Sequence, residues 1–141
     1  MSEIDKTNQE KGSLLVWVTN PAAAGRIVAR AKHFASEKGL ELKVVSVQRE
    51  TRGNWEDTIR DLERLKEAAT KSDAELTVVY SDDRIEAALK LAESENPRAM
   101  FTGVPEKGSA SAFADALYVR FPSVTLYCVD TKGEVNEYDK I

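Results

Sequence analysis

Short apolar runs alternate with amphipathic stretches along most of the chain. The first run, residues 14–18, is continuously apolar, which is typical of a central parallel strand covered on both faces. Further strands are expected at residues 40–47, 76–80, 99–102 and 124–129. The stretches between these strands have apolar residues at helical spacing, and they predict four helices that begin near residues 21, 54, 83 and 109.

Capping residues support the predicted helix ends. Asn20 suits the N-cap of the first helix, and Pro21 suits the position that follows. Gly39 is a plausible C-cap for the same helix. Asp83 and Glu86 have the spacing of a capping box at the third helix. In the second helix the stripe Trp55, Ile59, Leu62, Leu65 and Ala69 is expected to be buried.

Five strands that alternate with four helices predict an α/β fold with right-handed crossovers. The expected architecture is an open, doubly wound, parallel five-stranded sheet of Rossmann-like type, with helices on both faces. Residues 1–12 are polar and are expected to form a disordered tail before a domain of residues 13–130. In the C-terminal extension, residues 131–141, Gly133 suits a hairpin turn, after which residues 134–138 could fold back beside the fifth strand.

Length, charge and composition narrow the classes of function. A chain of 141 residues fits one domain, and its net charge is -4. No segment concentrates Lys and Arg, which argues against a nucleic-acid or membrane surface as partner. The N-terminal tail lacks a signal-peptide pattern and no apolar run spans a bilayer, so a cytoplasmic protein is expected. The single cysteine, Cys128, is expected to be buried.

Candidate ligand-binding residues follow from the rule that open α/β sheets bind ligands at the carboxyl ends of their strands. They come from the ends of the first, second and fourth strands and from the loop after the fourth: Thr19, Asn20, Val47, Gly103, Lys107, Gly108 and Ser109. Backbone N–H groups near Gly108 and Ser109 could face an anion at a helix N-terminus, with Lys107 adding charge. The alternative is a plain loop with a serine N-cap.

Catalytic patterns are weak in this sequence. There is no Gly-rich fingerprint after the first strand and no phosphate-loop motif. The single histidine, His33, lies in the middle of a predicted helix and is expected to be solvated or half-buried. Asp82 and Asp83 stand at a strand end, where helix capping accounts for them better than a magnesium site does. We therefore expect a protein without catalytic residues, without a metal and without an obligatory cofactor.

Several segments resemble universal stress proteins. They are LLVWVTNPAAAGRIVARAKHFASEKGLELKVVSVQ at residues 14–48, SDDRIEAALKLAESEN at 81–96, RAMFTG at 98–103 and PSVTLYCVD at 122–130. The likeness looks closest to the stress-protein-like domain of potassium-sensing histidine kinases, here standing alone. It implies the strand order 3-2-1-4-5 and a regulatory or binding role rather than catalysis.

The resemblance also implies which sequence pattern a nucleotide-binding loop should have. Nucleotide-binding members have a glycine, two residues, a second glycine, nine residues, and then Gly-Ser or Gly-Thr. Gly103 matches the first glycine, but Glu106 takes the place of the second, and Ala116 with Leu117 the place of the final pair. Those members also have an acidic residue after the first strand, where this chain has Thr19 and Asn20. The loop is therefore degenerate, and binding of ATP or AMP is expected to be weak or absent.

Stress proteins commonly dimerise through the last strand, which here begins at Val124 and ends at Val129. A homodimer through this edge strand is therefore expected. The alternative is that residues 134–138 cover the edge within one chain. Two other readings of function stay open: a phosphotransfer domain of receiver-like topology, and a protein-interaction module that binds a protein partner and no small ligand.

Overall fold

The computed structural model describes residues 12–18, 21–49, 55–103 and 112–138. Its strands are β1 (Ser13–Trp17), β2 (Glu41–Gln48), β3 (Glu75–Tyr80), β4 (Ala99–Gly103), β5 (Thr125–Val129) and β6 (Val135–Glu137). Its helices are the 3-10 turn η1 (Pro21–Ala23), α2 (Ala24–Lys38), α3 (Trp55–Lys71), α4 (Arg84–Glu95) and α5 (Ala112–Arg120). None of the helices in these ranges is both long and apolar enough to cross a membrane.

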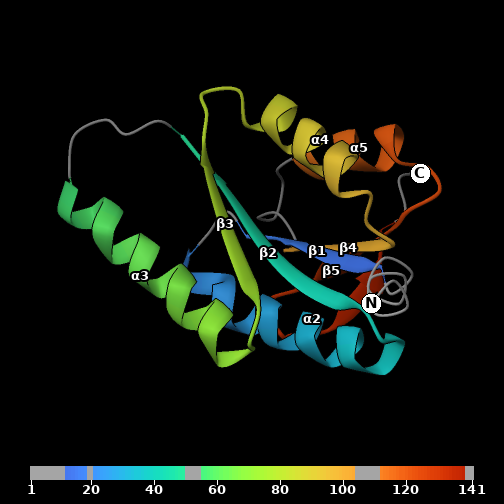
Figure 1. The fold of residues 1–141 in the computed structure, drawn as a ribbon, viewed down its shortest axis with the longest axis horizontal. Helices are drawn as coiled ribbons and strands as arrows, with labels where there is room; N and C mark the ends of the chain where they lie inside the picture. The colour runs from blue at the N-terminus through green and yellow to red at the C-terminus, as the bar shows by residue number, and fades with distance from the viewer. Residues whose placement is uncertain (1–11, 19–20, 50–54, 104–111, 139–141) are drawn as a thin grey trace, which may run out of the picture.

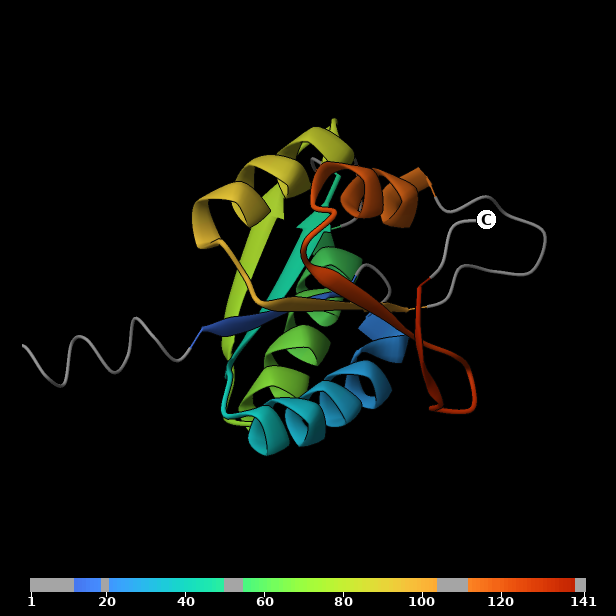
Figure 2. The same cartoon turned by 90° about the vertical axis from the view of Figure 1, so that its right-hand side faces the viewer.

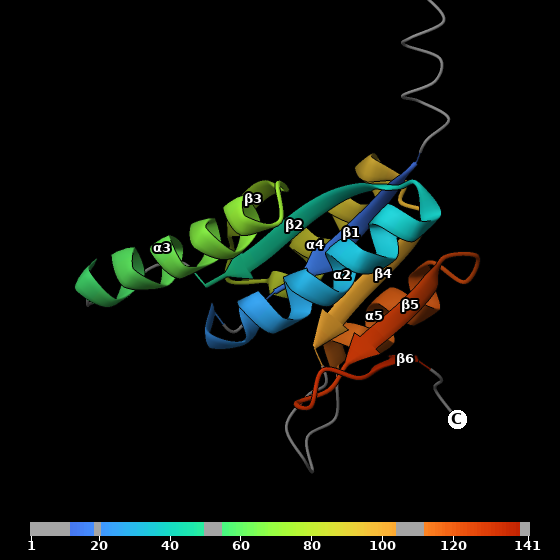
Figure 3. The same cartoon turned by 90° about the horizontal axis from the view of Figure 1, so that it is seen from below.

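The strands form one sheet in the order β3-β2-β1-β4-β5-β6. The first five are parallel, and their order confirms the prediction. The prediction of five strands is wrong, because β6 adds a sixth that runs antiparallel to β5 (Figure 3). The continuous apolar run of β1 fits its place in the middle of the sheet, where all five of its residues are buried.

Helices cover both faces of the sheet, as the sequence predicts (Figure 1). The face toward α2 and α3 buries the side chains of Leu14, Val16 and Phe101. The face toward α4 and α5 buries Leu15 and Trp17. The two sets alternate along β1 because successive side chains of a strand point to opposite faces.

Trp17 and Val44, which the predicted fold requires to be buried, are each only 1% exposed. The indole Nε1 of Trp17 lies 3.4 Å from the sulfur of Met100, and the ring packs edge-on against Phe113 with centroids 5.5 Å apart. On the other face, Val44 lies in the same apolar cluster as Leu65 of α3. Each apolar layer of the core thus contains a buried side chain from a central strand, Val44 on one face and Trp17 on the other.

A hairpin joins β5 to β6, so that β6 becomes the edge strand on this side of the sheet (Figure 2). Gly133 has φ +85, the left-handed conformation expected of it. The Asp130 carboxylate accepts hydrogen bonds from the backbone N–H groups of Lys132 and Glu134, both at 2.9 Å. Residues 134–138 therefore do return along β5, and Tyr138 N donates to Leu126 O at 2.7 Å beyond the end of β6.

Three details of the helices differ from expectation. The first helix opens with the 3-10 turn η1, and its α-helical part begins only at Ala24, although Gly39 is the left-handed C-cap as predicted. Asp83 caps α4 by accepting from Glu86 N at 3.1 Å, but Asp83 N donates to Ser81 Oγ rather than completing a capping box with the Glu86 side chain. Ile59, predicted to be buried, is 53% exposed, because the N-terminal half of α3 diverges from the strands (Figure 1).

Candidate functional site

The strand order reverses between β1 and β4, so their carboxyl ends form the topological switch point of the sheet. Of the predicted ligand-binding residues, Val47 and Gly103 lie at strand ends beside this point. The other five, Thr19, Asn20, Lys107, Gly108 and Ser109, lie outside the described residues.

Val47 and Gly103 contribute differently to this edge. The Val47 side chain is buried in the apolar cluster of Trp17 and Met100, so it helps to build the edge rather than facing the open end. Gly103 is partly exposed, and a Cβ there would lie 2.9 Å from Cδ1 of Ile27 on α2. The end of β4 therefore lies directly against the first turns of α2.

Arg26, next to Ile27 on α2, is a candidate that sequence reasoning missed. Its Nε is buried and has no hydrogen-bond partner in the described part of the chain. Its Cγ lies 3.9 Å from the position that a Cβ would take at Gly133, so the side chain runs between α2 and the β5–β6 hairpin. A buried guanidinium N–H without an acceptor is rare in folded proteins, and an anionic ligand is one way to supply the acceptor.

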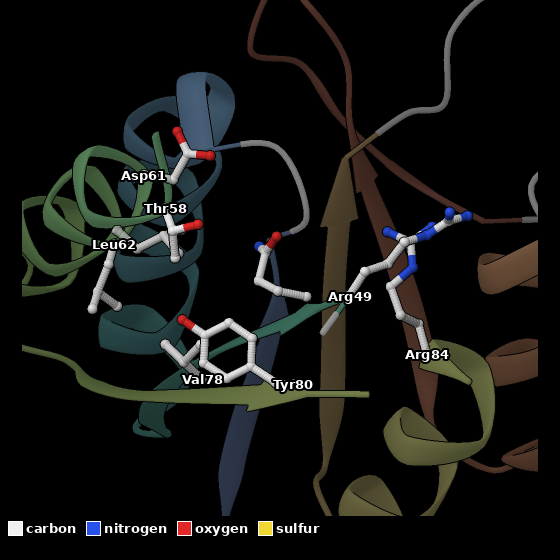
Figure 4. Close-up of a pocket in the computed structure, with 9 residues that line it drawn as sticks. Arg49, Thr58, Asp61, Leu62, Val78, Tyr80 and Arg84 are labelled. Carbon is white, nitrogen blue, oxygen red and sulfur yellow. The ribbon is translucent and has the colours of Figure 1, made fainter. Parts of the chain in front are cut away.

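A cleft of about 290 Å³ lies farther along the same edge, at the ends of β2 and β3 beneath α3 (Figure 4). Its inner wall is apolar and includes Leu62, Leu65 and Val78. Polar side chains line the rest of it, among them Asp61 of α3 and the two arginines Arg49 and Arg84. The sequence pattern does not indicate this cleft, although residues 58, 61, 62 and 65 share one helix face by their spacing.

Three side chains of the described residues have a clearly shifted pKa, and none of these shifts prepares the group for nucleophilic or acid–base catalysis. Burial raises the pKa of the Cys128 thiol to about 11, so this side chain is a protonated thiol at neutral pH. A hydrogen bond to the Asp115 carboxylate raises the pKa of the Tyr138 hydroxyl to about 12. Lys43 Nζ donates to Glu95 Oε1 at 2.7 Å, and this hydrogen bond raises the pKa of the ammonium group.

Other predicted features are structural. His33 is 74% exposed at its side chain and pairs with Glu37 at 3.4 Å, in agreement with the solvated state expected of it. Cys128 is buried as predicted. Within the described ranges, no group of three or more His, Cys, Asp or Glu side chains could hold a metal ion.

Solved structures share this fold. A universal stress protein from Archaeoglobus fulgidus superposes with a TM-score of 0.65 at 20% sequence identity, over 83% of this chain and 92% of that one. A universal stress protein from A. fulgidus in complex with dAMP gives a TM-score of 0.62 at 19% identity, over 83% and 96% of the two chains. A universal stress protein in complex with cAMP gives 0.62 at 15% identity, over 86% and 98%.

By sequence, the chain matches no protein-family model and no curated protein. At 15–20% identity, the structural likenesses establish a common fold. The chain is therefore an α/β protein that shares the fold of these universal stress proteins.

Proposed function

We propose that the chain is a non-enzymatic regulatory protein of the universal stress protein type, which binds an adenosine monophosphate weakly at the switch point of the sheet. The observation that carries this proposal is the buried Nε of Arg26, which has no hydrogen-bond partner among the described residues and belongs to α2, the helix whose Ile27 lies against the end of β4. The shared fold supports it, because two neighbours of that fold were solved with dAMP and cAMP, each of which contains one phosphate. The closer likeness to the domain of potassium-sensing histidine kinases is part of the proposal and rests on the sequence segments alone.

A monophosphate suits this chain better than a triphosphate. The loop after β4 departs from the glycine pattern of nucleotide-binding members at Glu106, where a carboxylate repels phosphate, and at Ala116 and Leu117. A loop without these glycines cannot bring its backbone N–H groups as close to a chain of phosphates. One phosphate needs fewer donors, and Arg26 supplies a charged one.

Calorimetry with AMP and ATP tests the proposal. AMP should bind more weakly than micromolar, that is by less than about 8 kcal/mol, and ATP should bind no more tightly than AMP. Arg26→Gln should weaken AMP binding about tenfold or more, since a hydrogen bond to a charged group contributes roughly 1.5–3 kcal/mol. Arg64→Gln, which removes the same charge from an exposed position of α3, is the control and should change the affinity little. Micromolar or tighter binding of ATP, or AMP binding that does not depend on Arg26, would contradict the proposal.

The absence of catalysis is a separate part of the proposal. It is supported by the protonated state of Cys128 and the solvated position of His33, neither of which is prepared for nucleophilic or acid–base work. Purified protein should therefore hydrolyse ATP no faster than background. A hydrolysis rate that Ser109→Ala abolishes would show that this part is wrong.

A protein-interaction module is the second candidate function. Tyr118 and Val119 on α5 and Val135 on β6 are large apolar side chains exposed to solvent, and β6 leaves one edge of the sheet unpaired within the described chain. The homodimer remains a proposal, and its geometry is constrained, because β6 pairs with β5 from Tyr127 to Val129. Light scattering on the full chain and on a variant that ends at Asp130 separates the outcomes. A dimer that survives the truncation indicates pairing through β5, and aggregation indicates that β6 protects that edge.

A further inference from the structure

The cleft beneath α3 has two walls from different layers of the domain. The face of α3 that carries Asp61, Leu62 and Leu65 forms one wall, and Val78 and Tyr80 of β3 form the other. The inner end is apolar, since Leu65 is buried in the core on this face. The outer part stays open because α3 diverges from the sheet toward its N-terminus, which also leaves Ile59 exposed. At about 290 Å³, the space approaches the roughly 300 Å³ at which small-molecule pockets begin.

Two arginines reach this cleft, one from the end of a strand and one from a helix on the opposite face of the sheet from α3. Arg49 follows β2, and Arg84 is the first residue of α4, which covers the other face. In Figure 4 both side chains extend to the same side of the cleft, away from Leu62 and Val78. Neither side chain has a hydrogen bond or an ion pair with any of the described residues. Two like charges at one end of a cleft repel each other, and an anion between them removes that repulsion.

The other residues that line the cleft indicate the chemistry of the uncharged part of the ligand. Tyr80 is 44% exposed and presents an aromatic ring beside the apolar wall, an arrangement that favours a planar or apolar group. Asp61 lies on the α3 side of the cleft, on the far side of Tyr80 from the arginines in Figure 4, and its carboxylate can accept a hydrogen bond. The lining thus has two positive charges at one end, an apolar middle and one acceptor at the other end.

We infer that this cleft is a second ligand site, separate from the switch point, for a small aromatic anion with a single phosphate or carboxylate group. The anionic group lies between Arg49 and Arg84, and the ring lies against Tyr80 and Leu62. A hydroxyl or amine on the far side of the ring donates to Asp61. Phosphate monoesters and carboxylates share this chemistry, since a guanidinium group binds both in a bidentate manner.

Binding measured by NMR titration of the full chain tests the inference, with phenyl phosphate, benzoate and phenol as probes. At least one of the two anions should bind saturably and shift the amide signals of Gln48, Leu62 and Tyr80. The anion that binds more tightly assigns the source, phosphate or carboxylate. Phenol, which has the ring without the charge, should bind at least about tenfold more weakly.

Charge-removing variants supply the controls. Arg49→Gln and Arg84→Gln should each weaken binding of the anion about tenfold, and the double variant should abolish it. Arg64→Gln removes the same charge from an exposed position of α3 outside the cleft and should have no effect. Arg26→Gln should also have no effect, so that failure of the proposed AMP site and failure of this one can be told apart. The inference is overturned if neither anion binds, if phenol binds equally well, or if binding survives the double variant.

Discussion

The C-terminal strand β6 is fastened to the rest of the domain by Tyr138, and removal of the hydroxyl group of this residue measures what that attachment contributes. The Tyr138 hydroxyl donates a hydrogen bond to Asp115 Oδ1 on α5. Its ring packs edge-on against Tyr118 with centroids 5.6 Å apart. The backbone N–H of Tyr138 also donates to Leu126 O of β5. Tyr138→Phe removes the first of these contacts and keeps the other two.

The size of the effect follows from the charge and exposure of the pair. A hydrogen bond to a charged group contributes roughly 1.5–3 kcal/mol when it is buried. The Tyr138–Asp115 pair is only partly buried, so solvent screening reduces the expected loss in free energy of unfolding to about 1 kcal/mol. For a chain of this length, that loss lowers Tm by roughly 3–5 °C.

The same contact has a predicted pH dependence. The pKa of Tyr138 is raised from 10.0 to about 12, so its contribution is fully present below pH 10 and is lost as pH rises through about 12. The stability difference between wild type and Tyr138→Phe should therefore be constant at neutral pH and shrink above pH 10.

Urea denaturation, together with hydrogen exchange of the β6 amides, measures the loss. Tyr118→Phe is the matched control, because it removes a hydroxyl group from the other ring of the pair, for which no hydrogen bond is seen in the described residues. The reasoning is refuted if Tyr138→Phe costs no more than Tyr118→Phe, or if exchange in β6 is unchanged.

Three further predictions concern the core and the helix ends. Gly103→Ala should lower the free energy of unfolding measured in urea by about 1 kcal/mol, because the new Cβ meets Ile27 Cδ1 at 2.9 Å, and adding Ile27→Val should restore part of the loss. Gly25→Ala is the control and should be stabilising, because its Cβ meets nothing within 4 Å. An equal cost at both glycines would contradict the steric argument. Asp83→Ala should cost about 1 kcal/mol by removing the N-cap of α4, and an unchanged denaturation midpoint would show that the cap contributes nothing. Cys128 should react slowly with a thiol reagent at pH 7 and quickly in denaturant, because burial raises its pKa to about 11; fast reaction in the native state would disprove this.

The five parallel strands could be predicted because their patterns are local. The apolar run of residues 14–18 and the helical spacing that follows it define a buried strand and an amphipathic helix without reference to the rest of the chain. The strand order came from the family resemblance and is confirmed by the pairing of β1 with β2 and β4. β6 is harder to predict, because its three exposed residues carry no apolar pattern and only the turn at Gly133 indicates that the chain folds back.

Features that depend on the distance between elements could not be predicted. Helical spacing places Ile59 in the buried stripe, but spacing within one helix does not show where along its length α3 leaves the sheet, and Ile59 is exposed in the structure. The cleft at Arg49 and Arg84 results from that divergence and was missed for the same reason. Arg26 appears as an ordinary surface residue of a helix in the sequence, and it becomes partly buried only because the β5–β6 hairpin lies against α2.

The central claim is that the switch point of the sheet binds an adenosine monophosphate, and NMR titration of the full chain with AMP tests it most directly. We predict weak, saturable binding that shifts the amide signals of Arg26 and Gly103. Shifts confined to Leu62 and Tyr80, or the absence of any saturable shift, would contradict the claim.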